Sequence, residues 1–225
     1  ANTEANTATK AALEAEQNQL LEAVDQLIAE ITGGPEYAKN LDLEAAKALK
    51  EEIAGYGDAI SKAYADDLLA GEIKFDSQTN ALRTKLDDLR GKWTGDVADW
   101  NAYNTYMNVV FPDLQGAFDT ATADIEKLSG VKGHETVFDA KKAAATEVVT
   151  GIFDTAKAAL KITEVKGAAA LIDGAKDTVA DAKTRMQAEV NGLTTLVNTQ
   201  NANYNTAAQQ HSEFISALKA CTLET

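Results

Sequence analysis

Residues 76–129 decide the fold, and they read DSQTNALRTKLDDLRGKWTGDVADWNAYNTYMNVVFPDLQGAFDTATADIEKLS. Apolar side chains recur through this stretch in steps of three and four, which is the spacing of one face of an α-helix. The series runs through Leu82, Leu86, Leu89, Trp93, Val97, Trp100, Tyr103, Met107, Val110, Leu114, Phe118, Ala121, Ile125 and Leu128. Such a helix would span roughly 80 Å at about 1.5 Å per residue, far more than a typical globular helix. We therefore expect it to need helical partners along both halves.

The composition of the whole chain predicts an all-α protein. Hydrophobic residues make up 45% of the 225 positions and charged residues 25%, which is typical of a globular protein with a real core. Only two residues are proline and 6% are aromatic, in a background rich in alanine, glutamate, lysine and leucine that favours helix. Residues 72–75 come nearest to a strand, but they lie between two helical patterns and are expected to form a loop.

Glycine, proline and capping residues predict the ends of the first two helices. The first is expected over residues 3–31, because Gly33 and Gly34 close its last turn and Pro35 cannot continue the helix. The second is expected to begin at Asp42, whose side chain can accept from the first free N–H groups, and to end at Gly71.

The long central helix is expected to start at a capping residue and to be disturbed once. Asp76 or Ser77 is the predicted cap, and Gly130 the predicted end. Pro112 removes one backbone donor and disfavours α conformation at Phe111, so we expect a kink or short break there. Two further helices are expected, over residues 135–163 and over up to about 50 residues after Gly167.

An internal repeat is suggested by residues that recur at one offset. Asn101, Asn104 and Asn108 recur 97 positions later as Asn198, Asn201 and Asn205. The loop residues 31–33 recur as residues 128–130 at the same offset, and Gly55 and Gly71 recur as Gly151 and Gly167 at an offset of 96. Together these matches predict two tandem copies of one unit, and chance similarity between alanine-rich helical patterns is the alternative.

The repeat predicts elongated tandem three-helix bundles that share a long, kinked central helix, with a first bundle over residues 1–108 and a second over residues 109–225. This arrangement resembles the architecture of spectrin-like repeats, in which the third helix of one bundle continues as the first helix of the next, although no sequence motif links the two. Residues 191–218 have no place in either bundle. Either the chain is a fragment of a longer array, or this segment docks on a second copy, or the helix bends back at Gly192.

Charge and hydropathy restrict the possible binding partners and the cellular location of the protein. The formal net charge of −14 disfavours nucleic acid and anionic lipid as partners. No apolar run reaches the ~20 residues that a transmembrane segment needs. Residues 1–10 are rich in asparagine and threonine, like a spacer behind a removed signal peptide or an upstream lipid anchor, so we expect an extracytoplasmic location; a shortened chain would look the same. Cys221, the one cysteine, is expected to be free or to form an intermolecular disulfide.

Catalytic and cofactor-binding motifs are not found in the sequence. The histidines, His134 and His211, lack the Glu-x-x-His and His-Glu-x-x-His spacings of metal sites. Glycine-rich phosphate loops and the Gly-x-Ser-x-Gly elbow are missing as well. Adjacent acids such as Asp87 and Asp88 point in different directions on a helix and are expected to be solvated. We therefore expect no catalytic residue, no metal, no cofactor and no enzymatic activity.

Two groups of residues remain candidates for binding a partner. Trp93, Trp100 and Met107 are spaced by seven, so they occupy one helical position and are expected to fill the core. Tyr106 departs from that position, and if it is exposed beside one tryptophan it would form a stacking platform for a sugar or peptide. Residues 198–210, which include Asn201 and Asn205, form an uncharged polar run that is typical of a helix association surface. The alternatives are a solvated polar face or buried amides that set helix register.

These patterns favour an exported or cell-surface helical protein that acts as a spacer, scaffold or adhesin-like module. Its expected partner is another protein or a second copy of itself, bound through helix faces. The alternative is a binding protein for a small apolar or aromatic ligand near Trp93 and Trp100. A third hypothesis, a lipid-surface protein, rests on the Ala-, Lys- and Thr-rich residues 154–183 and is weakened by the negative charge.

Overall fold

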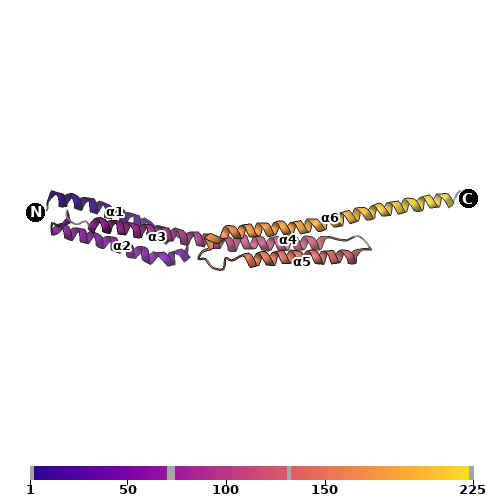
Figure 1. Cartoon of the computed structure of the whole chain (residues 1–225), viewed down its shortest axis with the longest axis horizontal. Helices are drawn as coiled ribbons and strands as arrows, with labels where there is room; N and C mark the ends of the chain where they lie inside the picture. The colour runs from indigo at the N-terminus through magenta and orange to yellow at the C-terminus, as the bar shows by residue number, and fades with distance from the viewer. Residues whose placement is uncertain (1–2, 70–73, 131–132, 223–225) are drawn as a thin grey trace. The chain divides into compact units, whose positions relative to one another are not determined.

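The computed structural model describes residues 3–69, 74–130 and 133–222, and every regular element within them is helical. The all-α prediction is therefore confirmed (Figure 1). The helices are α1 (Glu4–Gly33), α2 (Glu36–Ala65), α3 (Lys74–Thr105), the π-helical η2 (Tyr106–Val110), α4 (Phe111–Lys127), α5 (Glu135–Ala159) and α6 (Ala168–Thr222).

Contacts divide the chain into two units, which we describe separately. Unit 1 comprises Ala1–Tyr103 and Glu164–Ala170, and unit 2 comprises Asn104–Thr163 and Leu171–Thr225. That these are two copies of one repeat, with a domain boundary after residue 108, stays a prediction.

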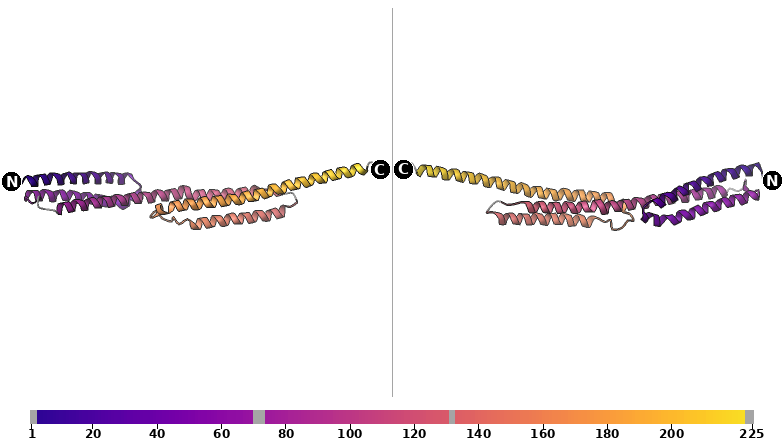
Figure 2. Two further views of the ribbon diagram at one scale, coloured as in Figure 1. Left: turned by 45° about the horizontal axis from the view of Figure 1, so that its top comes forward. Right: turned by 180° about the vertical axis from the view of Figure 1, so that it is seen from behind.

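Unit 1 is built on one hydrophobic core to which α1, α2 and α3 all contribute. The three helices lie side by side in Figures 1 and 2. Each contributes a stripe of side chains at helical spacing, and their fully or nearly fully buried members include Val24, Leu27, Ile31, Ala38, Ala46, Ile53, Ile60, Leu82, Leu86 and Trp93. Burial of a large apolar side chain stabilises a fold by about 1.5–3 kcal/mol, so this core is the main source of stability in unit 1.

The start of α2 corrects the predicted cap at Asp42. The helix begins at Glu36, directly after Pro35, whose missing N–H costs nothing at a helix start. Asp42 is instead fully buried inside α2 and accepts a hydrogen bond from Lys92 of α3. This bond raises the pKa of Lys92 above its ordinary value. A residue with the features of a helix cap is therefore a buried side chain whose partner lies far along the chain.

The end of α2 also differs from the prediction. The predicted end, Gly71, lies outside the described residues, and α2 stops earlier, at Ala65. Asp67 takes the left-handed conformation with φ 55°, and the N–H groups of Asp67 and Leu68 donate back to the carbonyls of Tyr64 and Ala63. This is a Schellman ending with aspartate where glycine is usual. The Asp67 carboxylate also accepts from the backbone N–H of Thr3, which caps α1.

Unit 2 contains α4, α5 and most of α6. The rings of Phe118 and Phe153 stack at 4.4 Å between α4 and α5, and Asp113 of α4 pairs with Lys183 of α6 at 2.7 Å. The buried side chains of α6 within this unit are Ile172, Ala175, Val179, Ala182, Met186, Val190, Leu193 and Val197. They alternate in steps of three and four, as the sequence predicts, with a single double step of four.

Helix ends in unit 2 are mostly earlier than predicted. α4 ends at Lys127 rather than Gly130, where Lys142 of α5 donates to the carbonyls of Glu126 and Leu128. α5 begins at Glu135 as predicted but ends at Ala159. Gly167, with φ 79°, precedes α6 as expected, and α6 is 55 residues long.

The disturbance expected at Pro112 is a π-helical segment, and no non-helical residue interrupts the backbone there. The N–H of Phe111 donates to the carbonyl of Tyr106, five residues earlier. Phe111 itself has α conformation, with φ −68° and ψ −45°, so the expected avoidance of α conformation before proline is wrong here. The wider π turn provides room for the proline ring, which a regular α turn would not. At its other end α3 already begins at Lys74, so neither Asp76 nor Ser77 caps it.

Candidate functional site

The two tryptophans, both predicted to be core residues, have intramolecular contacts in unit 1. Trp93 is buried, and its indole lies against the backbone between α1 and α2: a Cβ atom added to Gly34 would be 2.3 Å from Cη2 of Trp93. Trp100 is half-buried and stacks on Tyr37 of α2, with ring centroids 6.0 Å apart and planes 13° from parallel. Both indoles are thus engaged by residues of the same unit.

The stacking platform predicted around Tyr106 is wrong. Tyr106 is buried and lies against Phe111, with ring centroids 6.3 Å apart, whereas Met107 is 47% exposed. The exchange occurs at the π segment, of which Tyr106 and Met107 are the first two residues. Ala102, Tyr106, Val110 and Leu114 are buried in steps of four, whereas the predicted series has Tyr103 and Met107 before Val110 and Leu114.

The uncharged run containing Asn201 and Asn205 lies on the last part of α6. We call residues 198–221 the exposed segment, because none of its side chains is buried, whereas burial continues up to Val197. Asn201 is half-buried and Asn205 is exposed. The asparagines are therefore not amides buried inside unit 2, and the run is either a solvated face or an association surface.

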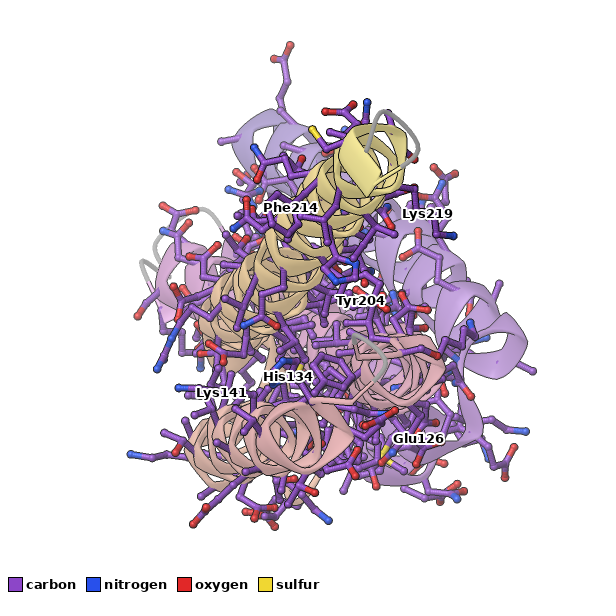
Figure 3. The ribbon with its side chains drawn as sticks, turned by 90° about the vertical axis from the view of Figure 1, so that its right-hand side faces the viewer. Glu126, His134, Lys141, Tyr204, Phe214 and Lys219 are labelled. Carbon is purple, nitrogen blue, oxygen red and sulfur yellow. The ribbon has the colours of Figure 1, made fainter. Side chains whose placement is uncertain are left out.

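Apolar side chains lie along one side of the exposed segment. Tyr204 is 45% exposed and Phe214 is 62% exposed, which are large values for aromatic residues on an amphipathic helix. Tyr204 also borders a groove with Gln200, Asn203 and Ala207 on one side and His134 and Val137, at the start of α5, on the other. Figure 3 labels His134 and Tyr204 at this groove and Phe214 farther along α6.

A second groove runs between α4 and α6 and is lined mainly by small or uncharged side chains. Its lining includes Gly116, Ala117 and Thr120 of α4 and Gln187 of α6. The Asp113–Lys183 ion pair crosses it, so its two formal charges cancel.

The pKa shifts of Tyr56 and Glu135 are caused by burial and by hydrogen bonds within the fold. The hydroxyl of Tyr56 is hydrogen-bonded to Thr79 and to the carbonyl of Phe75, and burial raises the pKa of Tyr56. The Gly133 N–H donates to both carboxylate oxygens of Glu135 and lowers the pKa of that side chain. Cys221 is exposed and is not in a disulfide.

In the described parts of the chain, no group of three or more His, Cys, Asp or Glu side chains is placed to hold a metal. None of the helices that the structure describes combines the length and apolarity needed to cross a bilayer.

Three features of the structure were missed by sequence reasoning. The stacking of Tyr37 on Trp100 and the groove at His134 involve residues that belong to no motif. The predicted repeat held a signal for them, since Tyr37 and His134 are themselves 97 positions apart. Asp99 was missed entirely: its carboxylate accepts from the N–H groups of Gly167 and Ala169 at 2.7 and 2.9 Å, where α6 begins.

Comparisons with known proteins supply no relative. No protein-family model, no curated protein and no solved structure matches the chain.

Proposed function

We propose that the chain is a non-enzymatic helical interaction protein, a spacer, scaffold or adhesin-like module, that binds another protein chain through the exposed segment of α6. The observation that carries the proposal is the change along one helix: α6 buries a side chain every three or four residues up to Val197 and buries none from residue 198 to residue 221. A helix of this length gains most of its stability from packing of an apolar face, so an exposed continuation with aromatic side chains fits a docking surface.

The other parts of the proposal rest on the sequence. The non-enzymatic character follows from the spacing of the histidines and the missing phosphate-loop and nucleophile motifs. For the extracytoplasmic location, the support is the asparagine- and threonine-rich composition of residues 1–10. Protease accessibility of the protein on intact cells tests the location, and digestion that occurs only after lysis would contradict it.

The ligand-binding alternative near Trp93 and Trp100 gains no support from the contacts. Gly34 lies against the buried Trp93, and Tyr37 stacks on one face of Trp100, so each indole already has a partner within unit 1. This alternative stays a prediction, and a change in tryptophan fluorescence on titration with aromatic ligands is its test.

Hydrogen exchange on the dilute full chain tests the docking surface. We expect amides of residues 198–221 to exchange much faster than those of residues 175–197 on the same helix, because only the latter are packed in unit 2. Equal protection of the two segments at a concentration at which the protein is monomeric would mean that the exposed segment packs on its own chain. That result would contradict the proposal.

A further inference from the structure

We infer that the partner of the exposed segment is the same segment of a second copy of this chain, so that two α6 helices pair in a homodimer. This inference rests on the proposed function and adds the identity of the partner. Four observations carry it: the continuity of the buried face of α6, the charge of the segment, its amide side chains and its length.

The exposed segment continues the buried face of α6 without a change of phase. The last buried residues of α6 are Val190, Leu193 and Val197, in steps of three and four. The same alternation continues through Gln200, Tyr204, Ala207, His211, Phe214, Leu218 and Cys221. A face with this spacing is the one that packs against another helix in a coiled coil, so the surface that α6 uses inside unit 2 continues directly into the exposed segment.

The charge of the segment selects a second copy over an oppositely charged partner. Glu213 and Lys219 are the only acidic or basic side chains other than His211 in residues 198–221, so the segment carries no net charge in a chain of −14. Two copies that met through an acidic face would repel each other, and this repulsion is smallest where two exposed segments meet. A cationic partner would find its counter-charges elsewhere on the chain.

The amides of the segment make it complementary to itself. Asn and Gln side chains each carry both donors and acceptors, so two copies of one such surface can satisfy each other's hydrogen bonds. The continued face of α6 includes Gln200, and beside it lie Asn201, Asn203 and Asn205. Polar seam residues weaken a coiled coil while limiting its register, so we expect a reversible dimer.

The length of the segment is sufficient for a pair of helices. Residues 198–221 span about 36 Å at 1.5 Å per residue, which is between three and four heptads and is the shortest length at which heptad patterns indicate a coiled coil. Phe214 and Tyr204 supply the large side chains that such a pair would bury.

Sedimentation equilibrium of the full chain under reducing conditions tests the inference. From about 1 to 200 µM, the range in which moderate protein affinities are resolved, we expect the mean mass to rise from 23.9 kDa towards twice that value. Tyr204→Glu combined with Phe214→Glu should keep the mass at 23.9 kDa throughout. The matched control is Val148→Glu with Leu171→Glu, which places two charges on exposed apolar positions outside the segment and should dimerise like the unchanged chain.

Each outcome separates this inference from the proposed function. A constant mass of 23.9 kDa for the unchanged chain overturns the dimer, and so does equal dimerisation of the segment variant and the control. Circular dichroism of both variants shows whether they are folded, which we expect because all four positions are exposed. A monomer whose residues 198–221 exchange rapidly leaves the proposed function standing with a different partner. Concentration-dependent protection of these amides, lost in the segment variant, supports the dimer.

Discussion

Replacing Gly34 by alanine is expected to destabilise unit 1, and the cause is steric. Gly34 has φ −88° and ψ −174°, an extended conformation that any residue adopts, so alanine brings no backbone strain. Its Cβ atom, however, would lie 2.3 Å from Cη2 and 2.5 Å from Cζ2 of Trp93. An ordinary contact needs at least 3.4 Å, so the indole must move by about 1 Å.

The size of the effect follows from where the indole would have to go. Trp93 is 7% exposed and is part of the core shared by α1, α2 and α3, and its ring is rigid, so it cannot yield as a flexible lysine would. Adding a methyl group to a well-packed core typically costs about 1–3 kcal/mol. We expect Gly34→Ala to lower the free energy of unfolding of unit 1 by this amount.

The neighbouring glycine provides a matched control. A Cβ atom on Gly33 meets nothing within 4 Å, and Gly33 is the last residue of α1. Gly33→Ala should therefore be neutral or stabilise unit 1 by about 0.4–1 kcal/mol, because alanine loses less backbone entropy on folding. Both tryptophans lie in unit 1, so urea unfolding followed by tryptophan fluorescence measures this unit.

A double-mutant cycle identifies the contact responsible. Trp93→Phe removes the ring atoms that a Cβ on Gly34 would meet and leaves Trp100 as the fluorescent probe. In that background only the Glu30 carbonyl oxygen, 3.2 Å from the added Cβ, remains close, so Gly34→Ala should cost much less and the coupling energy should be about 1–3 kcal/mol. If Gly34→Ala and Gly33→Ala shift stability alike, or if the cost of Gly34→Ala persists without the indole, the steric reasoning is refuted.

Three further predictions concern other contacts. Gly130→Ala should destabilise unit 2 by about 1–3 kcal/mol, because the added Cβ would lie 2.6 Å from the Cβ of Phe138. Gly151→Ala is the control and should not destabilise unit 2, because a Cβ at that position meets nothing within 4 Å. Thermal melts that rank the two variants in the reverse order would contradict this reasoning. Tyr56→Phe should cost about 0.5–1.5 kcal/mol by removing a buried hydroxyl. Because folding raises the pKa of Tyr56, its contribution is complete below the unfolded value of about 10 and declines as pH rises through the folded pKa; urea titrations should show this alkaline decline reduced in the phenylalanine variant. Asp99→Ala should cost about 0.5–2 kcal/mol and speed amide exchange at the start of α6, and unchanged exchange there would argue against the capping role.

Most of the helices could be predicted because their signals are local. The apolar steps of three and four predict α3, α5 and α6, and glycine and proline predict the end of α1 and the start of α6. Asp42 shows where such signals fail. An aspartate after a loop has the features of a cap, but Pro35 already starts the helix, and only the position of Lys92 on another helix shows that Asp42 is a buried ion-pair partner.

The candidate site was predicted only in part, because its composition is a local signal and its burial depends on distant residues. The uncharged run with Asn201 and Asn205 is visible in composition, and so is the uncertainty over whether it is covered. The burial of Tyr106 was not predicted, because the apolar steps on either side of it indicate neither the π-helical residues 106–110 nor which of their side chains face inwards.

The sequence by itself determined that the chain is helical and that its helices are long and amphipathic. These are properties of spacing along a single chain, which helix geometry converts directly into faces. Tertiary structure alone decided which faces are covered: Trp93 lies against Gly34, Trp100 stacks on Tyr37, and no side chain of residues 198–221 is buried. Burial depends on which distant residues arrive at a face, and a periodic pattern specifies the face without specifying its neighbour.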